Sequence, residues 1–163
     1  MFPETRFLAF DIFGIEDERP LDDFQRNYFK LYSNASAYDM SMKMLRDHGL
    51  LLDRCELHKG YFSDTVPTQL ERYRDPAGRK IAFAFLDCNI TASYEYLFGL
   101  LPPCVHPRGF IYMDEYHDNS DVPVLFRKFV QEVEETRGFG VELVRNAGGF
   151  GALYRFHGNQ GEL

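Results

Sequence analysis

Two short apolar runs, KIAFAFLDC (80–88) and GFIYM (109–113), constrain the fold of this 163-residue chain more than any other feature. An almost unbroken apolar stretch of this length is typical of a parallel strand that is covered on both faces. Between them, SYEYLFGLLPPCV (93–105) predicts a helix that ends at Pro102 and Pro103. A strand, a helix and a strand in succession indicate a parallel βαβ unit.

The N-terminal half of the chain continues this alternation. RFLAFDIF (6–13) and CELHKGYF (55–62) have the composition of short strands. DMSMKMLRDHGL (39–50) carries methionine and leucine at helical spacing and reaches Gly49, which is a favourable helix stop. PTQLERYRD (67–75) predicts a short helix that begins at its proline.

The C-terminal third predicts one long helix and a hairpin. VPVLFRKFVQEVEETRG (122–138) has helical periodicity and a closing glycine, and the apolar face expected from it comprises Val124, Leu125, Phe129 and Val133. VELVRNAGGFGALYRF (141–156) predicts two strands around a Gly-Gly turn. We therefore expect an α/β fold: a three-layer, Rossmann-like sandwich whose mostly parallel sheet ends in an antiparallel hairpin. Without an internal repeat or a Gly/Ser linker, residues 1–163 are expected to form one domain.

Composition argues against several classes of partner. The net charge is −7 and the pI is about 5.2, so the chain lacks the basic footprint that nucleic acid or an anionic membrane requires. Three scattered cysteines without a CxxC pair indicate reduced thiols. No apolar run has the length of a membrane helix, and the first residues lack the pattern of a signal peptide, so we expect a cytoplasmic protein.

Polar side chains follow the predicted strands, where α/β proteins bind their ligands. These side chains are Asp11 after the first strand, Asp87 and Asn89 after the third, and Asp114, Glu115 and His117 after the fourth. If the third and fourth strands are neighbours, Asp87, Asp114 and Glu115 meet at one sheet edge. Three carboxylates in one place suit a hard cation such as Mg²⁺, Ca²⁺ or Mn²⁺. The alternative is that these acids cap helices or simply solvate the loop ends.

Four of these segments also carry a family resemblance. The segments are FDIFGI, GYFSDTVP, FLDCNITAS and PRGFIYMDEY. In order and spacing they resemble four patterns of the macrocin O-methyltransferase (TylF/MycF) family, which are FDSFEGLP, GxFxDTLP, DCDLYxST and PGGxxxxDDY. That family is a branch of the class I S-adenosylmethionine (SAM) methyltransferases. The similarity extends from about Arg6 to Phe156.

The resemblance implies a role for each matching residue. Asp11 matches the acid that binds the ribose hydroxyls of SAM, and the chain passes near the adenine at Gly60, Tyr61 and Phe62. The family binds a divalent metal, expected to be Mg²⁺, at the positions that match Asp87, Asp114 and Glu115.

The chemistry implied is methyl transfer to a hydroxyl of a sugar or natural-product-like small molecule. Two catalytic residues are expected. Asp87 would act through the metal, and His117 would be the base that receives the hydroxyl proton. An ordinary surface histidine is the alternative for His117.

Several features depart from the family patterns. Asn89 and Glu115 each stand where the pattern has aspartate, and Thr91 stands where it has an aromatic residue. No glycine-rich ExGxxxG turn precedes Asp11, and GGFG at 148–151 belongs to the predicted hairpin turn. We therefore expect that the first strand of the sheet is missing and that the domain is incomplete at its N-terminus.

These departures leave two functions open. One is the SAM-dependent O-methyltransferase, and the other is a non-catalytic remnant or interaction module that keeps the scaffold without binding SAM. A GxSxG elbow and a Walker-type phosphate loop are both absent from the sequence, which disfavours a hydrolase or a kinase. Phe24, Tyr28 and Leu31 share a helical face that would serve either the core or a homo-oligomer interface.

Overall fold

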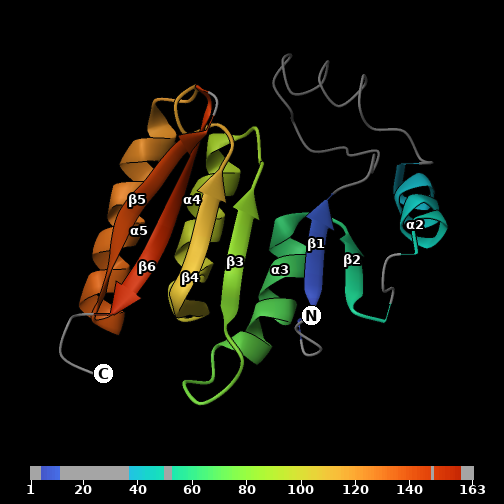
Figure 1. The fold of residues 1–163 in the computed structure, drawn as a ribbon, viewed down its shortest axis with the longest axis horizontal. Coiled ribbons are helices and arrows are strands. Elements are labelled where there is room, and N and C mark those ends of the chain that lie inside the picture. The colour runs from blue at the N-terminus through green and yellow to red at the C-terminus, as the bar shows by residue number, and fades with distance from the viewer. Residues whose placement is uncertain (1–4, 12–36, 50–52, 148, 159–163) are drawn as a thin grey trace. The chain divides into compact units, whose positions relative to one another are not determined.

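The computed structural model of the chain has two sheets, one in each of two compact units that span residues 1–66 and 67–163. The boundary between the units lies inside helix α3 (Phe62–Leu70). The structure describes residues 5–11, 37–49, 53–147 and 149–158 (Figure 1). The segment with Phe24, Tyr28 and Leu31 lies outside the described residues.

The first unit contains a two-stranded parallel sheet. Strand β1 (Phe7–Asp11) pairs with β2 (Cys55–Lys59), and the register places Asp11 opposite Lys59. Helix α2 (Ala37–Asp47) lies between the two strands in sequence and ends just before Gly49. The predicted strand, helix and strand are confirmed in this region, except that β2 ends at Lys59 and Phe62, which was predicted in the second strand, belongs to helix α3.

Helix α3 begins earlier than its proline suggested. It starts at Phe62, and Pro67 lies inside it, so the predicted start at Pro67 was wrong. The Tyr61 carbonyl accepts hydrogen bonds from the amides of Asp64 (3.0 Å) and Thr65 (3.0 Å) and from the Thr65 hydroxyl (2.9 Å). These bonds form the first turn before the chain reaches the proline. Pro67 then only removes one amide donor from a helix that is already under way.

The second unit contains a mixed four-stranded sheet. Its order is β3-β4-β6-β5, with β3 (Ile81–Leu86), β4 (Val105–Met113), β5 (Phe139–Ala147) and β6 (Gly151–Gly158). Strands β3 and β4 are parallel, whereas β6 pairs antiparallel with both β4 and β5. The predicted α/β class with a C-terminal antiparallel hairpin is therefore confirmed.

Two helices cover one face of this sheet. Helix α4 (Thr91–Leu100) connects β3 to β4, and α5 (Asp121–Arg137) connects β4 to β5 (Figure 1). Helix α5 ends at Gly138, whose φ of 69° is a left-handed conformation that glycine adopts without strain.

An aromatic cluster fills the space between the helices and the sheet. Phe129 lies at its centre: the ring centroids of Phe98, Phe126 and Phe156 are 5.1, 5.7 and 6.1 Å from that of Phe129. The side chains of α5 that are buried are Val122, Phe126, Phe129 and Val133. Val124 is 43% exposed, so its predicted place on the buried face was wrong. The buried residues follow one another at intervals of four, three and four, and Val124 falls outside this series.

Strand β3 is covered on one face only among the described residues. Ala84 and Leu86 are buried on the face toward the helices, whereas Phe83 is 56% and Phe85 is 58% exposed on the opposite face. The prediction that both faces of this strand are covered was wrong for the described part of the chain. A continuous apolar run cannot distinguish a strand covered on both faces from one with an aromatic face that stays open.

The buried face of α5 can be tested by a matched pair of substitutions. Phe129→Ala is expected to lower the free energy of unfolding by about 3–5 kcal/mol, because it leaves a cavity at the centre of the aromatic cluster. Val124→Ala, on the same helix, is expected to change it by no more than about 0.5 kcal/mol. Urea unfolding followed by circular dichroism measures both. Equal effects of the two substitutions would contradict this assignment.

Candidate functional site

The register of β3 and β4 brings two of the predicted acids together. Leu86 pairs with Met113 at the ends of the two parallel strands, so the residues that follow, Asp87 and Asp114, leave the sheet side by side. The Asp114 amide donates to the Leu86 carbonyl at 2.9 Å, which extends the hydrogen bonding one residue beyond the strands. The predicted convergence of these acids is thus explained by the backbone.

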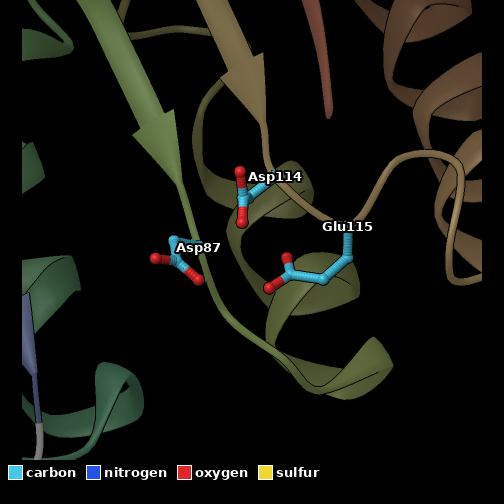
Figure 2. Close-up of side chains that lie close together, drawn as sticks. All are labelled: Asp87, Asp114 and Glu115. Atoms are coloured by element: carbon cyan, nitrogen blue, oxygen red, sulfur yellow. The ribbon is translucent and has the colours of Figure 1, made fainter. Parts of the chain in front are cut away.

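Glu115 completes a group of three carboxylates, which we call the acidic cluster: Asp87, Asp114 and Glu115. One carboxylate oxygen from each residue lies within 4.8 Å of the other two. Figure 2 shows the three side chains beyond the ends of β3 and β4, with the Glu115 side chain extending back toward Asp87. Asp87 is exposed, and the other two residues are partly buried.

The donor set of the acidic cluster fits a divalent cation. Two ligands on opposite sides of an ion lie two bond lengths apart, which is about 4.2 Å for Mg²⁺ and about 4.8 Å for Ca²⁺. The three oxygens lie no more than 4.8 Å apart, a limit that includes the separations expected for either ion, and all three donors are the hard oxygen ligands that such ions prefer. Among the described residues, neither Asp114 nor Glu115 forms an ion pair with a basic side chain.

Two tyrosine hydroxyls contact the acidic cluster. Tyr112 donates to Asp114 Oδ1 at 2.9 Å, and this hydrogen bond raises the pKa of Tyr112. Tyr94, which is completely buried, donates to Glu115 Oε2 and approaches the Leu86 carbonyl at 3.1 Å. Burial, followed by the hydrogen bond to Glu115, raises the pKa of Tyr94 above the usual range of a phenol. Both hydroxyls therefore stay protonated and act as donors to the carboxylates.

Cys88 lies beside the acidic cluster as a neutral thiol. Burial, together with the negative charges of Glu115 and Asp87, raises the pKa of Cys88 to about 12. A thiol binds a metal well only as the thiolate. Near neutral pH, Cys88 therefore adds no thiolate ligand, and the donors of the site remain oxygens.

The residues predicted to bind SAM lie at the carboxyl ends of β1 and β2, in the first unit. The Gly60 amide donates to the Asp11 carbonyl at 3.0 Å, so the two strand ends are held together. Gly60 has a φ of 148°, and a Cβ atom there would lie 2.8 Å from Thr65 Cγ2. Only glycine adopts this φ readily and also lacks the Cβ atom that would collide with Thr65. Tyr61 and Phe62 follow directly and enter helix α3, so the predicted group of four is contiguous in space.

His117 lies in the loop after β4 but is not a member of the acidic cluster. Its backbone amide donates to the Phe150 carbonyl at 2.8 Å, and its Nε2 lies 3.2 Å from Asn146 Oδ1 on β5. An amide oxygen only accepts hydrogen bonds, so Nε2 carries the proton in this contact and Nδ1 keeps its lone pair. The β5–β6 hairpin thus holds the ring and leaves Nδ1 as the basic nitrogen.

Tyr94, Tyr112 and Cys88 were not predicted from the sequence as site residues. A signal for Tyr94 was present: it lies in the first turn of the helix that follows Asp87, and helical side chains lean toward the N-terminus. A tyrosine there leans back toward the end of β3. Tyr112 precedes Asp114 by two residues and shares its face of the strand, which the alternation of β4 predicts.

Several solved structures with a similar fold are methyltransferases. No protein-family model matches the chain, and no curated protein matches it. The O-methyltransferase NovP is similar over 96% of this chain and 62% of its own, with 16% identity and a TM-score of 0.62. The calicheamicin methyltransferase CalS11 is similar over 96% of this chain and 61% of its own, with 19% identity and a TM-score of 0.63.

An O-methyltransferase from Bacillus cereus, solved in complex with SAH, has a TM-score of 0.52 and 14% identity over 92% of this chain and 72% of its own. At these identities the likeness shows the fold, which is that of Rossmann-like class I methyltransferases. The chain spans about three fifths of the length of NovP and CalS11. Within the described residues, every helix is too short or too polar to span a bilayer.

Gly151 on β6 makes room for Tyr112 at the acidic cluster. A Cβ atom at position 151 would lie 2.6 Å from Tyr112 Cζ and 3.0 Å from the Met113 carbonyl oxygen. The ring of Tyr112 is also stacked on Phe85, with centroids 5.0 Å apart. A side chain at position 151 would therefore displace the ring and break its hydrogen bond to Asp114.

Gly151→Ala is accordingly expected to destabilise the fold by about 1–3 kcal/mol through overpacking. Gly99→Ala is the matched control, because a Cβ atom at that position of α4 meets no other atom within 4 Å. This control is expected to stabilise the chain by about 0.5–1 kcal/mol, since alanine suits a helix better than glycine. Thermal unfolding of both variants tests the prediction, which fails if the two shift the melting temperature in the same direction.

Proposed function

We propose that this chain is a SAM-dependent, divalent-metal-assisted O-methyltransferase of the macrocin O-methyltransferase (TylF/MycF) type. Its acceptor would be a hydroxyl of a sugar or natural-product-like small molecule. The observation that carries the proposal is the acidic cluster: three carboxylate oxygens within 4.8 Å at the ends of neighbouring strands. The fold shared with NovP and CalS11 supports the reaction type.

The residues of the second unit would hold and orient the acceptor. Asp87, Asp114 and Glu115 would bind the divalent ion, and a bound ion of this kind lowers the pKa of a coordinated hydroxyl. Tyr112 fixes the Asp114 carboxylate through its hydrogen bond. His117 Nδ1, the basic ring nitrogen, would receive the hydroxyl proton, while Nε2–H stays bonded to Asn146.

The residues of the first unit would bind the methyl donor. The Asp11 carboxylate suits a pair of ribose hydroxyls, because it can accept two hydrogen bonds from them. The glycine at position 60 keeps the strand end free of side-chain bulk, so that a planar base could approach the backbone between Gly60 and Phe62. SAM, when bound, supplies an already activated methyl group, so the protein needs no nucleophile of its own.

SAM binding is the first test of the proposal. Isothermal titration calorimetry of the chain with SAM is expected to show binding, and Asp11→Asn is expected to weaken it about tenfold to hundredfold because a charged acceptor is lost. Asp47→Asn is the control, since that exposed acid only pairs with Lys43 on α2. No binding by the wild-type chain would instead favour a non-catalytic scaffold. Equal binding by Asp11→Asn would remove Asp11 from the site.

Metal dependence is the second test. Asp114→Asn is expected to raise the Kd for Mn²⁺ at least about tenfold, because the charge of the ligands sets the affinity. It is also expected to abolish methyl transfer, as is treatment of the wild type with EDTA, with recovery on addition of Mg²⁺. Asp118→Asn is the control, because this exposed acid belongs to the same loop but not to the acidic cluster. Full transfer activity in the presence of EDTA would exclude the metal.

A further inference from the structure

The buried hydroxyl of Tyr94 connects three parts of the second unit. The side chain comes from α4, its hydroxyl donates to Glu115 Oε2 after β4, and it lies 3.1 Å from the Leu86 carbonyl at the end of β3. The same Leu86 carbonyl accepts the Asp114 amide at 2.9 Å. Tyr94 therefore contacts one member of the acidic cluster and the residue next to a second.

Glu115 needs such a partner more than the two aspartates do. A glutamate side chain has one more rotatable bond than aspartate, and fixing it costs more conformational entropy. The Tyr94 ring is held in place, because it is completely buried and packs against Phe98 with ring centroids 5.9 Å apart. A carboxylate has about four lone-pair positions, so the bond to Tyr94 leaves Glu115 able to bind a cation as well.

We propose that Tyr94 is a positioning residue whose hydroxyl holds the Glu115 carboxylate in the geometry that a divalent cation at the acidic cluster requires. This inference rests on the metal site of the proposed function. In the pattern DCDLYxST, which the sequence resembles at residues 87–94, the position of Tyr94 is threonine, and in DDY the position of Glu115 is aspartate. The longer acid and its tyrosine partner are therefore features of this chain.

The test is a comparison of Mn²⁺ affinities, measured on the whole chain from the electron paramagnetic resonance signal of free Mn²⁺. Tyr94→Phe removes only the hydroxyl and is expected to raise the Kd about tenfold to hundredfold, the usual effect of losing a residue that orients a metal ligand. Tyr154→Phe is the matched control. It also loses a tyrosine hydroxyl bond, to Tyr116 at 2.7 Å, but that hydroxyl contacts no carboxylate of the acidic cluster.

A double-mutant cycle separates positioning of Glu115 from general loss of structure. Glu115→Asp shortens the side chain and withdraws it from Tyr94, so Tyr94→Phe is expected to have less than a twofold effect in that background. An equal effect of Tyr94→Phe in both backgrounds would overturn the inference, because the hydroxyl would then act through Leu86 or through packing. Two other outcomes would also overturn the inference: an unchanged Kd for Mn²⁺ in Tyr94→Phe alone, or the same loss of Mn²⁺ affinity in Tyr154→Phe as in Tyr94→Phe.

Mn²⁺ binding by the wild-type chain distinguishes the role of Tyr94 from the metal site on which that role depends. If the wild-type chain binds Mn²⁺ and Tyr94→Phe binds it equally well, only the role of Tyr94 is wrong. If the wild-type chain does not bind Mn²⁺ at millimolar concentration, the metal site itself is wrong and the role of Tyr94 falls with it.

Discussion

The parallel register of β3 and β4 is the constraint on which the candidate site depends. Because Leu86 pairs with Met113, the first residues beyond each strand are both aspartates and leave the sheet together. A shift of one residue would turn one carboxylate to the opposite face and separate the pair. Burial constrains this register, because Leu86, Ile111 and Met113 are buried and a shift of one residue would turn the buried side chains of one strand to the opposite face. The hydrophobic core of the second unit therefore sets the geometry of the acids.

The two faces of that sheet serve different purposes. The helix-covered face carries the aromatic cluster around Phe129, and Tyr94 extends from this apolar layer to the acids through a single hydroxyl. The opposite face carries Phe83 and Phe85, which are more than half exposed, and the stacked pair of Phe85 with Tyr112. Aromatic rings beside a group of acids can bind an apolar or planar part of a small molecule while the acids bind its polar part. The stacked Phe85–Tyr112 pair lies next to the last residue pair of β3 and β4, close to the acids.

Much of this arrangement follows from sequence, and the exceptions have physical causes. Alternation of strands and helices predicted the α/β fold, and the position of the acids after the apolar runs predicted that Asp87 would meet Asp114. The start of α3 was missed because the first turn is made by hydrogen bonds to Tyr61, whereas proline is the stronger signal in sequence. The exposure of Phe83 was missed because an apolar strand looks the same whether its second face is covered or open. Tyr94 was missed because the partner it contacts is 21 residues away, although its place in the first turn of α4 already directs its side chain toward the end of β3.

Electrostatic repulsion sets the free-energy cost of the acidic cluster in the folded chain when no cation is bound. Two unit negative charges at a separation of 4.8 Å, the upper limit for the oxygens of the acidic cluster, repel each other by about 1 kcal/mol in water and by about 3.5 kcal/mol at an effective dielectric constant of 20. Because Asp87 is exposed, its repulsion with the other two carboxylates is near the value in water. Asp114 and Glu115 are partly buried, so the repulsion between them is stronger. Hydrogen bonds from Tyr112 and Tyr94 offset part of this, and each goes to one of the two less exposed acids. A divalent cation bound there would convert the repulsion into attraction and would stabilise the folded chain. The two tyrosines therefore keep the acids in place in both states, at the positions where the cation would need them.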